Sequence, residues 1–394
     1  TQLTFSNKHE HWIARLNTKV RINDFQAVKQ ELPMFDFNVK PYQIGTSSWI
    51  INNNFSAGYL DYLYAKETSH VHNFHSSRIH LNQQLFRNYS LGRFNISPKV
   101  GYNAISYSNS PRSDAQLLAA ANFGIECNTR LISNYSSFAH TIVPYAGYEY
   151  VTKPTVTTHN HYVFDLQDGY GRLNTLRFGA RNYFSCANKE DFEKMLMFDL
   201  YGRAFYSTKA IGSTVPRIYL DGKWKATSWS TYSLQSAWDT QHNILDHLNL
   251  RGDVTVTDDI AFGLEYRHRS SYAWRKVDVG NFILDSVVSE HRLRKSQLSD
   301  RRDTFLTNVF LRLSPTVILE LKTRNGWHRI RRPSYIEYEV DLTTVIGGAL
   351  RVTFSYQHRR PDNRFDIRFR IGGGGGHKST KTEVTRIGHA NYNN

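Results

Sequence analysis

Charged residues at alternate positions are the clearest candidates for binding chemistry in this chain. Between 364 and 371, Arg364, Asp366, Arg368 and Arg370 are separated by single apolar residues. Successive side chains of a strand point to opposite faces, so this spacing gathers the ions on one face. Guanidinium groups suit phosphate and carboxylate ligands. The recurring pattern predicts polar side chains that face a water-filled interior: Arg177, Arg181, Arg203, Arg251, Arg267, Arg351, Arg368, Arg370, Asp199, Asp253 and Glu265. The alternative is an ordinary ladder of ions that bond to one another.

Nucleotide chemistry and hydrolysis find little support in the sequence. The stretch Gly372–Thr380 is similar to a phosphate-binding loop, but His377 stands where a glycine is required and no apolar helix follows. There is no G-x-S-x-G motif, and no spacing singles out a set of serine, histidine and acid. We therefore expect no enzyme, no catalytic residue and no cofactor.

Metal and nucleic-acid binding are also disfavoured. The formal net charge is +15, but the arginines alternate with apolar residues and do not form the basic patch typical of nucleic-acid binding. Histidines cluster in polar, loop-like stretches, where we expect ordinary loop side chains without a metal: His70, His72, His75, His80, His159 and His161.

The apolar half of the pattern indicates a membrane. Phe365, Ile367, Phe369 and Ile371 occupy the face opposite the ions. The chain of 394 residues is 14% aromatic, with only 3 Met and 10 Pro, which favours strands. No run of 18 or more apolar residues occurs, so a helical span is excluded. We predict an all-β fold, an antiparallel transmembrane β-barrel with lipid outside and water inside.

We count about 16–18 or more strand-like segments, each about 9–14 residues long, which suits tilted strands that cross a bilayer. Pro98 and Pro144 fall inside two of them and predict bulges or edges. Long connections are expected at Ala65–Ser76, Thr152–Gly171 and Trp274–Arg302, on one side of the barrel. The barrel should comprise residues 1–371, and residues 372–394 a flexible, glycine-rich polar tail.

A series of motifs resembles the C-terminal barrel portion of the LPS-assembly protein family LptD, also called OstA or Imp. The matching positions follow one another along most of residues 10–376: Trp12, Arg15, Asp24-Phe25-Gln26 and Leu32-Pro33 within His11–Pro41; Ser56–Ala65; His140, Thr141, Pro144, Tyr148 and Tyr150 within Ala139–Val151; Phe164-Asp165 with Asp168; and the glycine-ended Arg351–Gly376.

The sequence also departs from the family. Glu31 replaces the usual arginine, and Leu176–Phe184 keeps only Gly179 and Arg181 of a G-x-D-R element. Cys127 and Cys186 do not correspond to the family's disulfide scheme, and spacing does not decide whether they pair. The family's N-terminal periplasmic domain and first barrel strands are absent from this sequence. We therefore expect the C-terminal part of such a protein or a shortened relative.

The resemblance implies a function in the bacterial outer membrane. Members insert lipopolysaccharide into the outer leaflet, with an LptE-like plug lipoprotein in the lumen, an LptA-like periplasmic bridge, and contact with outer-membrane lipids. In the family a lateral seam joins the first and last strands. Its last strand would here be Arg364, Phe365, Asp366, Ile367, Arg368, Phe369, Arg370 and Ile371. The alternative is a passive porin or substrate-specific channel; an outer-membrane hydrolase is a third reading.

Overall fold

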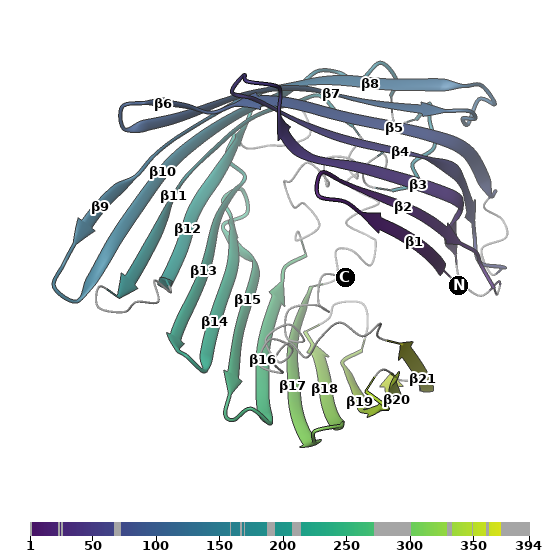
Figure 1. Cartoon of the computed structure of the whole chain (residues 1–394), viewed down its shortest axis with the longest axis vertical. Helices are drawn as coiled ribbons and strands as arrows, with labels where there is room; N and C mark the ends of the chain where they lie inside the picture. The colour runs from purple at the N-terminus through teal and green to yellow at the C-terminus, as the bar shows by residue number, and fades with distance from the viewer. Residues whose placement is uncertain are drawn as a thin grey trace.

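The fold is one antiparallel β-sheet that curves around a central hollow (Figure 1). The computed structural model describes residues 2–22, 24, 27–66, 72–157, 159–165, 168, 170–186, 194–206, 214–271, 301–328, 333–348, 350–359 and 362–371. Among them, no helix is long and apolar enough to cross a membrane. The expected tail at 372–394, and most of the expected connection Trp274–Arg302, lie outside these residues.

The described residues form 21 strands, which confirms the predicted all-β antiparallel fold. They are β1 (Gln2–Lys8), β2 (Trp12–Lys19), β3 (Val28–Gln43), β4 (Trp49–Leu63), β5 (Phe74–Arg87), β6 (Tyr89–Leu91), β7 (Phe94–Tyr107), β8 (Gln116–Thr129), β9 (Leu131–Asn134), β10 (Phe138–Val151), β11 (Leu173–Cys186), β12 (Lys194–Phe205), β13 (Arg217–Thr227), β14 (Ser230–Asp239), β15 (Ile244–Thr255), β16 (Ile260–Arg269), β17 (Arg302–Ser314), β18 (Val317–Trp327), β19 (Tyr335–Ile346), β20 (Leu350–Arg359) and β21 (Asp362–Ile371).

Each long strand pairs with its neighbours in chain order, and the short strands β6 and β9 extend the sheet beside β7 and β10. Within the described residues, β1 pairs only with β2 and β21 only with β20. Figure 1 shows these two strands at the free edges of the sheet, on either side of a gap. The described sheet is therefore a curved wall that is not closed by a β1–β21 ladder.

Both prolines expected to interrupt a strand do so at a change of neighbour. β7 pairs with β6 as far as Ile96 and with β5 from Lys99, so Pro98 lies between the two ladders. β10 pairs with β9 as far as Ile142 and with β8 from Tyr145, so Pro144 lies at the same kind of switch. A proline has no N–H for a ladder, which is why these edges accommodate it. The predicted edges are confirmed.

A third proline lies within a strand. Leu32-Pro33, one of the family-like motifs, lies inside β3, at a shift of register between Glu31 and Met34. A bulge disrupts the ladder locally and leaves a position without a paired N–H. Pro33 therefore sits within the strand without losing a hydrogen bond. Phe25 and Gln26 of the same motif lie outside the described residues.

The three longest expected connections emerge at one rim of the sheet. They follow β4, β10 and β16. Three long strands lie between β4 and β10 and five between β10 and β16, so in an antiparallel sheet all three strands end at the same rim. The opposite rim has tight turns, such as 228–229 between β13 and β14 and 315–316 between β17 and β18. Bacterial outer-membrane barrels have this asymmetry, with short periplasmic turns and long extracellular loops.

Candidate functional site: the inner face of the sheet

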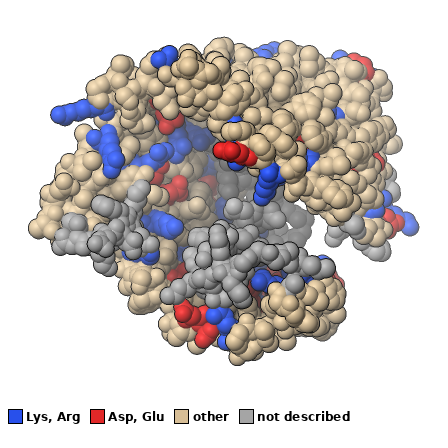
Figure 2. Space-filling model, in the orientation of Figure 1, with Lys and Arg blue, Asp and Glu red and all other residues tan. Residues whose placement is uncertain are grey.

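The two faces of the sheet differ in chemistry. Large apolar side chains are exposed on the outer face, including Phe35, Ile79, Phe123, Phe178, Leu200, Leu250, Phe262 and Phe354. In Figure 2 the outer surface is mostly uncharged, and many charged side chains lie in the hollow. A water-soluble monomer rarely exposes apolar area on this scale, whereas hydrocarbon solvates it. The wall is that of a bacterial outer-membrane β-barrel, with an apolar outer surface and an ion-lined interior.

The structure places the eleven predicted polar residues on strands, and several of them alternate with exposed apolar neighbours. Arg177 precedes Phe178, Asp199 precedes Leu200, and Arg368 precedes Phe369. These residues do not form one site. They divide among three groups of strands, β11–β12, β15–β16 and β20–β21: Arg177, Arg181, Arg203 and Asp199; Arg251, Arg267, Asp253 and Glu265; and Arg351, Arg368 and Arg370.

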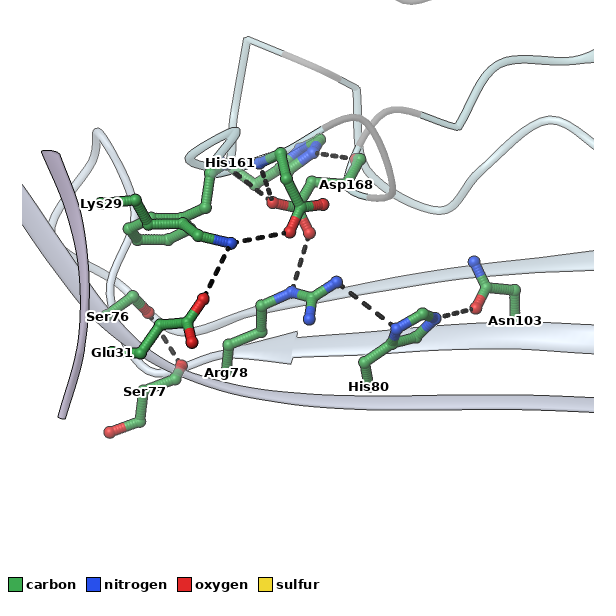
Figure 3. A network of polar contacts seen from close by, with 11 residues as sticks. Lys29, Glu31, Ser76, Ser77, Arg78, His80, Asn103, His161 and Asp168 are labelled. Carbon is green, nitrogen blue, oxygen red and sulfur yellow. Dashed lines mark hydrogen bonds and ion pairs between the residues drawn. The ribbon is translucent and has the colours of Figure 1, made fainter. Parts of the chain in front are cut away.

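Over β3–β8 the inner face is covered by the segment 152–172, which joins β10 to β11; we call this region the packed wall. Figure 3 shows Arg78 of β5 directed at Asp168 of that segment. Arg78 Nε lies 2.8 Å from Asp168 Oδ1, and the two side chains are 1% and 0% exposed. The other carboxylate oxygen of Asp168 accepts hydrogen bonds from the backbone N–H groups of Phe164 and Asp165, at 2.8 and 3.0 Å. Asp168 is therefore fully satisfied although it is buried.

Further polar contacts hold the segment against the packed wall. Lys29 of β3 donates to Asp165, with Nζ 3.2 Å from Oδ2, and also lies 3.4 Å from Glu31 Oε1. His161 is 2% exposed, with Nε2 2.9 Å from the carbonyl oxygen of Asp168. On the strand side, His80 bonds through Nε2 to the Asn103 side chain (Figure 3).

A buried apolar cluster lies beneath this segment. Leu60, Ile105, Tyr107 and Leu118 project from the strands and pack with Phe164 of the segment. Tyr170 packs against the cluster, and burial raises the pKa of its hydroxyl to about 12. The predicted water-filled interior does not extend to this region, where apolar side chains pack together. The 152–172 segment contributes aromatic residues of its own. The free energy gained by burying them offsets the cost of removing water from the polar groups that the segment covers.

Over β10–β21 the inner face carries ion pairs between neighbouring strands; we call this region the ion-ladder wall. Arg251 Nη1 lies 3.6 Å from Glu265 Oε2, and Arg267 also pairs with Glu265. Further along, Lys322 Nζ lies 3.0 Å from Glu320, 3.4 Å from Glu339 and 2.9 Å from Asp341. Here one cation is surrounded by three carboxylates.

The predicted seam strand lies at one edge of the sheet. β21 carries exposed Phe365 (80%), Ile367 (58%) and Phe369 (69%) on its apolar face. On its ionic face, Arg364 pairs with Asp366, and Arg368 Nη2 lies 3.0 Å from Asp341 of β19. Arg370 stands opposite Arg351 in the ladder. Ile371 ends the strand. The edge facing it across the gap belongs to β1.

Three arginines gather on β11 and β12; we call Arg177, Arg181 and Arg203 the arginine cluster. Arg177 and Arg181 share one carboxylate, since their guanidinium nitrogens lie 3.6 and 3.4 Å from Asp199 Oδ2. The Tyr145 hydroxyl lies 2.9 Å from both Asp199 oxygens. Arg181 also stacks on Tyr145, and Arg177 on Tyr201, with Cζ 4.4 and 4.5 Å from the ring centroids.

Gly179 leaves room for this arrangement. A Cβ at this position would lie 2.9 Å from the Tyr145 hydroxyl oxygen and 2.6 Å from the backbone oxygen of Leu200. Tyr145 can therefore cross β11 to reach Asp199 only because residue 179 has no side chain. Gly179 and Arg181 are the two residues by which Leu176–Phe184 resembles the G-x-D-R element.

The sequence did not identify the most buried charges of the molecule. Arg217 Nε lies 2.8 Å from Asp246 Oδ2, with side chains 2% and 0% exposed. Asp303 is contacted by His268, His328 and Tyr266. Arg78, Lys322 and Asp341 were also missed. Most of the partners in these groups lie on other strands, and Asp168 lies on the 152–172 segment, so a local sequence pattern could not bring them together.

The histidine expectation needs correction, and the cysteines are unpaired. His75 and His80 lie in β5, and His80 and His161 are buried, so these are not loop side chains in water. Tertiary burial by the 152–172 segment overrides the polar local sequence. Among the described residues, no group of three or more His, Cys, Asp or Glu side chains is arranged to hold a metal ion. Cys127 and Cys186 are both free thiols.

No protein-family model and no curated protein matches the chain. Solved structures similar to it include the siderophore receptor PirA from Pseudomonas aeruginosa, with a TM-score of 0.47 and 7% identity over 91% of this chain and 68% of that one. A mutant of the ferric enterobactin receptor PfeA from the same organism gives 0.44 and 7%, over 90% and 64%. A mutant of Rh. blastica porin gives 0.32 and 9%, over 82% and 99%. Similarity at this level assigns no function.

Proposed function

We propose that this chain forms the wall of an outer-membrane translocon that inserts lipopolysaccharide into the outer leaflet. The observation that carries the proposal is the sharp division of one continuous sheet into a hydrocarbon-facing and an ion-lined face. Lipopolysaccharide has the same division, since its acyl chains prefer hydrocarbon and its sugars and phosphates prefer water. The order of family-like motifs along the sequence supports the same function.

The free edges of the sheet support a lateral exit. An amphiphile can leave a barrel sideways only where two strands are not joined by a continuous ladder. β21 combines an apolar outer face with four ions on its inner face. We propose that its residues line the seam, with the fatty part of the substrate on the side of Phe365 and Phe369 and the polar part on the side of Arg368 and Arg370.

Partners follow from the same proposal. An LptE-like lipoprotein would occupy the part of the lumen that the packed wall leaves open, and an LptA-like bridge would deliver substrate at the short-turn rim. Outer-membrane lipids would contact the exposed apolar face. The alternative is a passive or substrate-specific channel, favoured by the ion ladders, which suit a water-filled passage with charge selectivity.

A depletion experiment tests the proposal. We expect that repressing the gene reduces the amount of lipopolysaccharide at the cell surface. Labelling of its sugars on intact cells measures this amount. A photocrosslinking amino acid at Phe369 should capture lipopolysaccharide, whereas one at Phe123, far from either edge on the same apolar face, should not. Normal surface lipopolysaccharide after depletion, together with ion conductance by the purified chain, would favour the channel function instead.

A further inference from the structure

The arginine cluster on the inner face carries a charge imbalance. Arg177 and Arg203 stand directly opposite each other on β11 and β12. Side chains so placed have Cβ atoms about 4.5–5.5 Å apart, and like charges in this position are destabilising. Asp199 already serves both Arg177 and Arg181. Within the described part of the chain, Arg203 has no carboxylate partner. Among the described residues, the arginines of the cluster therefore outnumber the carboxylates paired with them.

The guanidinium groups are accessible from the lumen. The side chains of Arg177 and Arg181 are 38% and 37% exposed, in contrast to Arg78 and Arg217, which are sealed against their partners. Stacking on Tyr145 and Tyr201 fixes the planes of the two guanidinium groups. A planar, positioned guanidinium is suited to two-point binding of phosphate.

Next to the cluster, a row of polar side chains runs across the wall at one level. The ladder register places Asp199 opposite Asp221, Asp221 opposite Gln235, and Gln235 opposite Asn249. Asn249 donates to Gln235, with Nδ2 3.3 Å from Oε1, and Asp221 accepts from Tyr201 at 3.2 Å. Carboxylates and amides with remaining acceptor and donor capacity suit the hydroxyls of a sugar.

We infer that the arginine cluster and the row Asp221–Gln235–Asn249 form a binding site for a phosphate-bearing sugar. The phosphate would lie against Arg203 and Arg177, and the sugar hydroxyls would bond along the row. This inference needs only an ion-lined lumen and does not depend on the proposed export of lipopolysaccharide. The Lys322 group is a natural contrast, because there the carboxylates outnumber the cation.

Calorimetric titration of the full chain in lipid nanodiscs tests the site. Glucose 6-phosphate should bind saturably, inorganic phosphate more weakly, and glucose not measurably. Arg203→Gln should weaken glucose 6-phosphate binding by about tenfold or more, the size expected for a lost charge-assisted contact. The matched control is Arg324→Gln, which removes one luminal charge from a partly exposed pair with Glu337 and should change the affinity less than about twofold.

Far-UV circular dichroism of each variant checks that the sheet is intact. Equal weakening by both substitutions would reduce the effect to general charge attraction and overturn the inference. Saturable binding of glucose, or none of glucose 6-phosphate, would also overturn it. Competition with lipopolysaccharide then identifies the source of the ligand. Displacement of glucose 6-phosphate indicates a lipid-linked sugar, and its absence a soluble one. Surface lipopolysaccharide after depletion is measured separately, so the two proposals can fail independently.

Discussion

The packed wall and the ion-ladder wall are made from strands with the same alternation of polar and apolar residues. Their inner faces differ, because one is covered by another segment of the chain and the other stays partly exposed. In the packed wall, a segment of the chain covers the strands, seals Arg78 against Asp168 and buries Leu60, Ile105 and Leu118. In the ion-ladder wall, Arg177, Arg181 and Arg368 stay partly exposed. One half of the interior therefore contributes mainly stability, and the other half keeps surface available for a ligand.

Breaking the buried pair should give the largest effect. Arg78→Met leaves the Asp168 carboxylate without its cation in a site closed to water, which typically costs about 3–5 kcal/mol. We expect a fall of this size in the free energy of unfolding, measured by urea titration in lipid vesicles, and faster proteolysis within 152–172. The double variant Arg78→Met/Asp168→Asn should recover much of the loss, because it removes the charge and keeps an oxygen that accepts from the N–H groups of Phe164 and Asp165. An unchanged cleavage rate would contradict the role of the pair as an anchor.

Emptying the apolar cluster should cost somewhat less. Ile105→Ala removes buried methyl groups and should lower the free energy of unfolding by about 2–5 kcal/mol, compared with about 0.5–1.5 kcal/mol for Ile105→Val. The same titration measures both. If the two variants were equally stable, the cluster would not be packed in solution, and the distinction between the walls would be lost.

The direction of the faces is tested on β15. Leu250→Arg places a charge on the outer face and should destabilise the chain by about 2–4 kcal/mol if the residue lies near the bilayer midplane. Asn249→Arg puts the same charge on the inner face, one residue away, and should cost at most about 1 kcal/mol, from the like charge of Arg267 opposite it. Folding yields into vesicles, followed by urea titration, compare them. A reversed order would mean that the sheet is inside out.

The smallest effect is expected for a single rung of the ion-ladder wall. Arg324→Gln loses an ion pair with a nitrogen–oxygen distance of 3.9 Å, in which the arginine side chain is 44% exposed. Such pairs contribute about 0–1 kcal/mol because water screens them. Unfolding measurements should barely distinguish this variant from the parent chain. A loss as large as that of Arg78→Met would show that both walls are equally structural.

Alternation along the sequence was enough to predict the strands and their faces. Successive side chains of a strand point to opposite faces, so the local sequence shows which residues face lipid, as Phe365 and Arg364 illustrate. No long-range information is needed. Pro98 and Pro144 could also be interpreted locally, since a missing N–H restricts where a proline fits. Functional assignment beyond an outer-membrane barrel rests on the family resemblance of the sequence.

Long-range contacts could not be predicted in the same way. Arg78 and Asp168 are separated by 90 positions, and nothing in the aperiodic segment 152–172 indicates that it folds inward. Arg177 faces Arg203 because of the register in which β11 and β12 pair. A shift of this register by one residue would turn the side chains of one strand to the opposite face of the sheet. Two features did hint at these sites: the Phe164-Asp165 motif with Asp168, and Gly179 with Arg181.

The clustering of the long connections at one rim determines which parts of the chain can be reached from outside an intact cell. In the orientation usual for outer-membrane barrels, residues 108–115, between β7 and β8, belong to the rim that faces the medium, and 228–229 to the rim that faces the periplasm. Antibodies and phages meet only the first rim on an intact cell. An epitope tag after Ser113 should therefore stain living bacteria, and one after Gly347, between β19 and β20, only permeabilised ones.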